Sequence, residues 1–230
     1  MKKLLSIIIL AGFITKANSQ TYLQGGTNLA NITETSSGQT QRNNLLTTFN
    51  VGILGRFDLS KIVDLESGLL FEGRGAKANT YFTSSLEDNY VKSRFNPLYL
   101  EVPLNLVIKI PFQKHMNIFF NAGPYAAMGI AGKAKSETRI FGATSTSTSN
   151  IKFSNDDPFT SKQDDAAYDK IKRFDFGLNL GGGLDLGKVL LKVNYGYGFT
   201  KINSTQSDNG SDNKNKYRTL SVSLGIPLNG

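Results

Sequence analysis

The feature of this sequence that most constrains its fold is a strict alternation of apolar and polar residues, which recurs along most of the chain. Around residue 50, for example, Phe49, Val51 and Ile53 alternate with Asn50 and Gly52. A period of two places every second side chain on the same face, so each segment is predicted to be a β-strand with one apolar and one polar face. The segments cover residues 48–57, 63–74, 98–109, 117–126, 173–186, 189–199 and 220–226, with a weaker one at Tyr22–Ala30.

The apolar faces of the seven clearer segments carry no Asp, Glu, Lys or Arg. An Arg or Lys that faces lipid at the middle of a bilayer costs about 2 to 4 kcal/mol. Unpaired backbone groups in hydrocarbon cost several kcal/mol each, so strands that span a membrane close into barrels without free edges. We therefore expect the uncharged faces to contact acyl chains and the polar faces to point into a barrel.

The connections between the predicted strands alternate in length. They are tight at residues 59–62, 111–115 and 187–188, and long and polar at residues 31–44, 77–92, 131–170 and 203–216. Outer-membrane barrels have this layout, with short turns in the periplasm and longer loops outside the cell. The sequence predicts an all-β fold, an up-and-down antiparallel transmembrane β-barrel of about eight strands.

The first 19 residues are predicted to be a signal peptide, and residues 20–230 a single outer-membrane β-barrel domain. Lys2 and Lys3 precede an apolar run, Leu4–Ile14, and small residues follow at Ala17–Ser19. This run is too short for a spanning helix, which needs about 20 apolar residues, and fits an export signal. The sequence has no Cys, which excludes disulfides and a lipidated Cys anchor. We expect export to a Gram-negative outer membrane.

The charge of the chain is moderately basic. The formal net charge is +8, and loss of Lys2, Lys3 and Lys16 with the signal peptide would leave +5. No strongly basic helix or aromatic-basic strand motif for nucleic acid is present, so no nucleic-acid partner is expected. The expected partners are outer-membrane lipid and anionic lipopolysaccharide.

The polar faces carry charges of both signs in equal number, five cations and five anions. An eight-stranded barrel has an interior just wide enough for side chains to fill, so these residues are predicted to form a paired charge network that plugs the barrel. Glu101 and Asp175 have a second interpretation as proton relays, although ion pairing with Arg74 or Arg173 is favoured. The predicted network consists of Arg56, Glu66, Glu72, Arg74, Glu101, Lys109, Arg173, Asp175, Asp185 and Lys192.

No catalytic, cofactor or metal site is predicted, and the protein is not expected to be an enzyme. His115 is the sole histidine and falls in a predicted periplasmic turn. The acidic pairs Asp156–Asp157 and Asp164–Asp165, and the acids at 208–212, lack the distal Glu of a calcium loop. The run Gly181–Gly183 has no Lys-Ser or Lys-Thr ending that would cradle a phosphate.

Four short motifs give the chain a resemblance to a known family. They are Gly25–Leu29, Tyr99–Leu104, Asn121–Tyr125 and Phe174–Gly183. With the strand layout, these motifs resemble the outer-membrane β-barrel proteins labelled porin-family or PorT-like. The resemblance implies an up-and-down barrel that the barrel assembly machinery inserts during biogenesis. A few members of the family look like accessory factors for protein secretion.

Three functional hypotheses follow. The leading one is a structural or interaction role in the envelope, in which loop 131–170 is long enough to reach a protein partner. The second is a small-solute porin, which would require a gap among the inward charges. The third is a secreted, lipocalin-like barrel in which the apolar faces point inward and hold a ligand.

Overall fold

The computed structural model describes residues 19–36, 39–42, 44–84, 87–113, 116–156, 170–202 and 214–228. The predicted signal peptide, apart from Ser19, lies outside these residues. No helix among the described residues has the length and hydrophobicity needed to cross a bilayer. The strands are β1 (Ser19–Ser36), β2 (Gln39–Arg42), β3 (Leu46–Asp58), β4 (Val63–Gly73), β5 (Ala76–Ser84), β6 (Glu87–Gln113), β7 (Met116–Ile140), β8 (Ala143–Asn150), β9 (Lys152–Ser154), β10 (Lys170–Lys172), β11 (Phe174–Asp185), β12 (Leu190–Gly198) and β13 (Lys214–Pro227).

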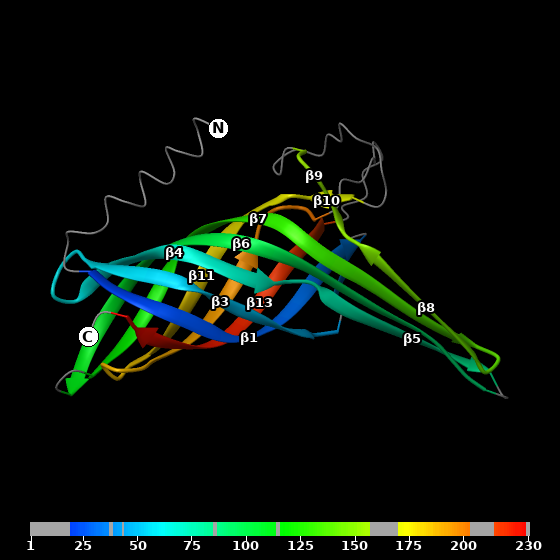
Figure 1. Ribbon diagram of the computed structural model, residues 1–230, viewed down its shortest axis with the longest axis horizontal. Coiled ribbons are helices and arrows are strands. Elements are labelled where there is room, and N and C mark those ends of the chain that lie inside the picture. Colours follow the sequence, from blue (N-terminus) through cyan, green and yellow to red (C-terminus); the bar gives the residue numbers. More distant parts are fainter. Residues whose placement is uncertain are drawn as a thin grey trace.

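Eight of these strands form a closed antiparallel ring, in the order β6-β4-β3-β1-β13-β12-β11-β7 (Figure 1). Pairing of β6 with β7, from Leu98↔Ala131 down to Gln113↔Met116, closes the ring. Ring closure leaves every spanning strand with a hydrogen-bonded neighbour on both sides, as hydrocarbon requires. The predicted all-β barrel of about eight strands is confirmed.

The apolar face of each ring strand points outward. Leu180 is 65% exposed and Phe120 56%, whereas their neighbours in the alternation, Asn179 and Asn121, are buried in the interior. The secreted, lipocalin-like hypothesis is therefore wrong, because it required the apolar faces to line the inside. The outward face is the one with no charged residue, so the strands can contact acyl chains without burying a charge.

The three short connections between consecutive ring strands lie at one end of the ring, together with the start of β1 and the end of β13. They join β3 to β4, β6 to β7 and β11 to β12. In the last of these turns Gly187 has a φ of 80°, a left-handed conformation that glycine adopts at little cost. This end corresponds to the periplasmic side, and the long connections leave from the opposite, extracellular end.

Three segments predicted as polar loops are instead largely strands, and this part of the prediction is corrected. Residues 31–44 continue β1 and contain β2, residues 77–92 form the hairpin of β5 with β6, and residues 131–170 include the hairpin of β7 with β8. The backbone ladder continues beyond the hydrocarbon, where neither face contacts acyl chains, so no apolar alternation marks a strand. Consequently β6 has 27 residues and β7 has 25, although about 9 to 11 suffice to span a bilayer.

These outer strands form a sheet that projects from the extracellular end of the barrel, away from the C-terminus (Figure 1). We call it the extension and define it as residues 76–97 and 131–150, described apart from residues 85–86. Residues 203–213 of the fourth predicted loop, 203–216, lie outside the described residues. The last three residues of that loop belong to β13, which begins at Lys214.

A charge on the outward face should destabilise the barrel in proportion to its depth. We expect Leu180→Arg, at the middle of β11, to lower the free energy of unfolding by about 2 to 4 kcal/mol, because the guanidinium would face hydrocarbon. The matched control, Ile62→Arg in a periplasmic turn, should cost about 0 to 1 kcal/mol. Urea unfolding in lipid vesicles measures both, and equal effects would contradict the assigned orientation.

Candidate functional site

The interior holds a first group of charges near the periplasmic end, centred on Glu66 of β4. The Glu66 carboxylate accepts hydrogen bonds from Arg56 Nε at 3.0 Å and from Asn105 Nδ2 at 3.0 Å. It also accepts from the Tyr22 hydroxyl and the Lys192 ammonium. These four donors come from four different strands, β3, β6, β1 and β12. We call these five residues the Glu66 cluster.

The Glu66–Lys192 ion pair crosses the full width of the barrel, because β4 and β12 are opposite one another in the ring of eight. The guanidinium of Arg56 lies 4.2 Å from the ring centre of Phe119 on β7, a distance typical of a cation–π contact. Asp185 Oδ2 lies 4.0 Å from Arg56 Nη1. Residues from across the ring thus meet at the axis and fill it.

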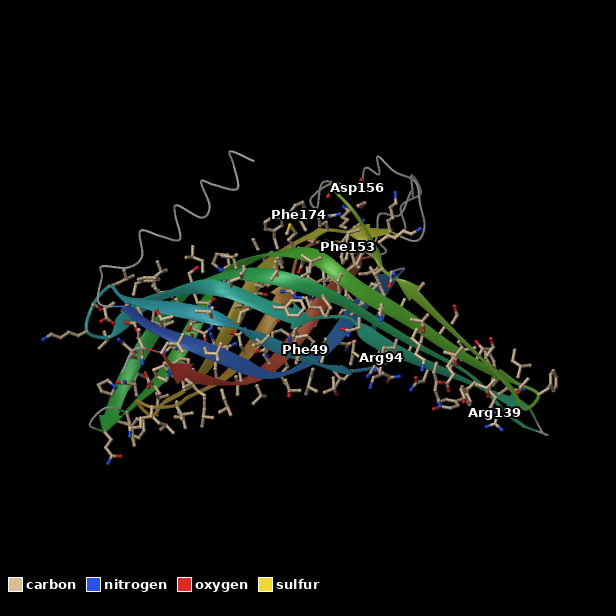
Figure 2. The ribbon with its side chains drawn as sticks, in the orientation of Figure 1. Phe49, Arg94, Arg139, Phe153, Asp156 and Phe174 are labelled. Carbon is tan, nitrogen blue, oxygen red and sulfur yellow. The ribbon has the colours of Figure 1, made fainter. Side chains whose placement is uncertain are left out.

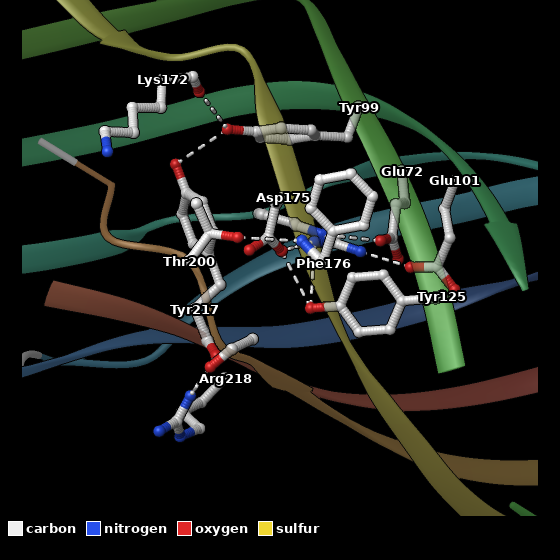
Figure 3. Close-up of polar contacts among 12 residues, drawn as sticks. Glu72, Tyr99, Glu101, Tyr125, Lys172, Asp175, Phe176, Thr200, Tyr217 and Arg218 are labelled. Carbon is white, nitrogen blue, oxygen red and sulfur yellow. Dashed lines mark hydrogen bonds and ion pairs between the residues drawn. The ribbon is translucent and has the colours of Figure 1, made fainter. Parts of the chain in front are cut away.

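A second group of charges lies nearer the extracellular end, around Arg74, which directly follows β4. Arg74 Nε donates to Glu72 Oε1 at 2.6 Å, and the other guanidinium nitrogens pair with Asp175 and Glu101. Figure 3 shows Glu72, Glu101, Asp175 and Tyr125 converging on this point. The Tyr125 hydroxyl donates to Asp175 at 2.8 Å. We call these five residues the Arg74 cluster.

Two chains of amide side chains in the space between the clusters lead to carboxylates of the Arg74 cluster. On one side, Asn121 donates to Asn194, Asn194 to Asn179 and Asn179 to Glu101, each at 2.9 to 3.0 Å. On the other, Asn50 donates to Asn28 at 2.6 Å and Asn28 to Glu72 at 3.0 Å. Neutral donors therefore satisfy carboxylate oxygens that Arg74 alone does not reach. A cavity of about 30 Å³ remains between the clusters, space for roughly one or two waters.

The extracellular mouth is covered by an aromatic and aliphatic cap. Tyr99 and Tyr217 are fully or almost fully buried, with ring centres 5.5 Å apart. Phe153 of β9 packs edge-on against Tyr99 at 5.9 Å, and Ile171 of β10 joins the same hydrophobic cluster. Arg74 lies 5.2 Å from the Tyr99 ring, so the cap rests directly on the Arg74 cluster.

The structure brings eight of the ten predicted charges into the buried interior: Arg56, Glu66, Glu72, Arg74, Glu101, Asp175, Asp185 and Lys192. Lys109 lies instead at the periplasmic end, where its Nζ is 2.7 Å from Asp64 and 3.2 Å from Asp58. Arg173 is half-buried at the extracellular end and belongs to neither cluster. Sequence reasoning missed buried Asp64 and Lys172, and also the asparagines, whose inward position in the alternation was the available signal.

The residues considered for catalysis or metal binding contribute little to this arrangement. His115, Asp157, Asp164, Asp165 and the acids at 208–212 lie outside the described residues. Asp156 accepts a hydrogen bond from Ser154 at 2.9 Å, and Gly181–Gly183 lies within β11. In the part of the chain that is described, no three His, Cys, Asp or Glu side chains are grouped to hold a metal ion.

Comparison with protein families identifies the fold. The model of the outer membrane protein beta-barrel domain matches residues 17–204, most of the chain. The chain belongs to this family. It is thus an outer-membrane β-barrel protein of the Gram-negative type, in contact with outer-membrane lipid. No curated protein matches the chain significantly.

Solved outer-membrane barrels are similar at low identity. The attachment invasion locus protein Ail of Yersinia pestis is 15% identical, with 91% of this chain and 99% of that chain covered and a TM-score of 0.37. Neisserial surface protein A is 12% identical, with 90% and 97% covered and a TM-score of 0.38. The N-terminal barrel domain of Pseudomonas aeruginosa OprF is 9% identical, with 92% and 98% covered and a TM-score of 0.33. The assignment rests on the family match.

Removing the central carboxylate should destabilise the barrel strongly. We expect Glu66→Gln to cost about 3 to 5 kcal/mol, because Arg56 and Lys192 would remain buried without their counter-charge. The double variant Glu66→Gln/Lys192→Met should recover part of this loss. The control Asp58→Asn removes a carboxylate from an exposed pair and should cost about 1 kcal/mol or less. Urea unfolding in vesicles tests the series, and a cost of E66Q equal to that of D58N would contradict it.

Proposed function

We propose that this protein is a non-conducting, non-enzymatic component of the outer membrane with a structural or interaction role, formed by residues 20–230 after removal of a signal peptide at 1–19. The observation that carries the proposal is the filled interior. The Glu66 cluster spans the barrel near one end, and the Arg74 cluster and the cap occupy the other. A cavity of about 30 Å³ between them is too small for a continuous water path.

The extension supports the interaction part of the proposal. It projects beyond the barrel and ends in β8, which is exposed along its whole length (Figure 1). Loops and hairpins at the extracellular end of outer-membrane barrels are the parts that a partner outside the cell can reach. A protein partner reached through residues 131–170, and a secretion-accessory role like that of PorT-like proteins, are the specific forms of this proposal.

The filled interior predicts electrical behaviour. In planar bilayers the protein should give no steady conductance steps, because ion-paired side chains occupy the axis at two levels. Phe153→Ala, which opens the cap alone, should also give none, since both charge clusters remain beneath it. A wide 16-stranded porin, inserted at the same density, serves as the positive control. Regular steps from the wild-type protein, or solute uptake by loaded liposomes, would favour the small-solute porin hypothesis instead.

The outer part of the β5–β6 hairpin, which belongs to the extension, should be dispensable for the barrel and necessary for the role. Asn79 and Lys92 are direct partners, so an Asn-Gly turn replacing residues 80–91 would close a two-residue hairpin. We expect the trimmed chain to insert into the membrane with a free energy of unfolding within about 1 kcal/mol of wild type. The pairs of β6 with β7 that close the ring, from Leu98↔Ala131 to Gln113↔Met116, are not removed. In cells lacking the gene, the full chain should restore resistance of the envelope to detergent and the trimmed chain should not. Full complementation by the trimmed chain would contradict a role for this hairpin of the extension.

A further inference from the structure

Three cations stand side by side on one face of the extension. In the strand register Lys77 of β5 pairs with Arg94 of β6, and Arg94 pairs with Lys135 of β7. Side chains of directly paired residues lie on the same face about 4.5 to 5.5 Å apart at Cβ. Lys77, Arg94 and Lys135 therefore form an unbroken row across three strands, which we call the basic row.

The basic row has no counter-charge among the described residues. Among the residues that can be described, no carboxylate pairs with Lys77, Arg94 or Lys135. Glu137, an acid that lines the same groove, is the direct partner of Lys92 and accepts a hydrogen bond from the Tyr90 hydroxyl at 2.9 Å. Like charges directly opposed on a sheet are destabilising, so this row costs stability that an anionic ligand would restore.

The row borders a groove large enough for anionic groups. The groove is open to solvent, has a volume of about 260 Å³ and is lined by the row together with Lys92 and Glu137, and by the polar residues Asn79 and Ser93. Lysine and arginine side chains, with amide and hydroxyl groups beside them, can donate hydrogen bonds to phosphate oxygens. In Figure 2, Arg94 and Arg139 both lie along the lower side of the extension.

The position of the row relative to the lipid identifies the occupant. Arg94 lies on the same outward face of β6 as Leu98 and the exposed Val102. Its direct partner Lys135 therefore lies on the outward face of β7, beyond the register shift that follows the Leu98↔Ala131 pair. At about 3.3 Å per residue, Arg94 is roughly 13 Å along the strand from Leu98. The basic row thus faces the surrounding membrane, at the height of its headgroups, and does not face the barrel axis or the open medium above it.

We propose that Lys77, Arg94 and Lys135 form a binding site for the phosphate groups of lipopolysaccharide in the outer leaflet around the barrel. Arg94, at the centre, offers a planar pair of N–H donors to one phosphate, and the flanking lysines supply charge from either side. The site fastens the extension against the membrane surface. It depends only on the orientation of the barrel in the outer membrane, so a conducting barrel would leave it intact.

The test compares matched double variants of the purified barrel in detergent. Arg94→Gln/Lys135→Gln removes two charges from the row, and Lys61→Gln/Lys188→Gln removes two exposed charges from periplasmic turns. The probes are bis-phosphorylated lipid A, the same lipid A without phosphates, and soluble dextran sulfate. Heat-dependent gel migration confirms that each variant is folded before binding is measured.

We expect the row variant to bind bis-phosphorylated lipid A about tenfold or more weakly, since two charge-assisted contacts are lost. The control should stay within about twofold of wild type, and added salt should weaken wild type more than the row variant. Dephosphorylated lipid A should bind weakly to all three. Equal binding of phosphorylated lipid A to wild type and the row variant would overturn the site. Loss of dextran sulfate binding alone, with lipid A unaffected, would assign the row to a soluble polyanion and overturn the lipopolysaccharide proposal.

Discussion

Closure of the backbone hydrogen-bond ladder is the constraint on which the rest of this structure depends. A strand edge in hydrocarbon would leave a row of unpaired N–H and C=O groups, so β6 must pair with β7 and complete the ring. A ring of eight strands has little room at its axis. The outward side chains must then be uncharged, and the inward side chains must fill the interior of the barrel. The division of the sequence into apolar and polar alternate positions follows from these two demands.

The filling is polar although buried charges are costly. Moving a charged group out of water costs several kcal/mol, and the cost is repaid only when partners satisfy the group closely. Glu66 meets this condition through four donors on four strands. Arg74 meets it through three carboxylates, and asparagine amides hold the second oxygens of two of them, Glu72 and Glu101. Because these contacts join strands that are not neighbours in the ring, they select one packing of the interior as well as occupying it.

The sequence predicts the ring well because membrane strands impose a strong pattern, with lipid on one face and a narrow interior on the other. It predicts the extension poorly, because strands with no face against hydrocarbon show no apolar alternation. In β8, for example, Thr and Ser alternate over residues 144–149. The alternation of apolar and polar residues placed both Arg74 and Arg173 on the inward face. Only Arg74 contacts the buried carboxylates Glu72, Glu101 and Asp175. Arg173 directly precedes β11, with its N–H bonded to the Ser154 carbonyl, and alternation carries no information on depth along the axis.

The residue types on each face of a strand also depend on depth along the barrel axis. On β6 the inward face changes from charged at Glu101 to aromatic at Tyr99, where the cap excludes water from the Arg74 cluster. The outward face of the same strand is apolar as far as Leu98 and basic at Arg94 and Lys92. Both changes occur within a few residues, where the strand leaves the hydrocarbon. A basic residue below that level would face acyl chains at a cost of about 2 to 4 kcal/mol, whereas above it the same residue meets anionic headgroups. The residue types on both faces of β6 thus change at the level where the strand leaves the hydrocarbon.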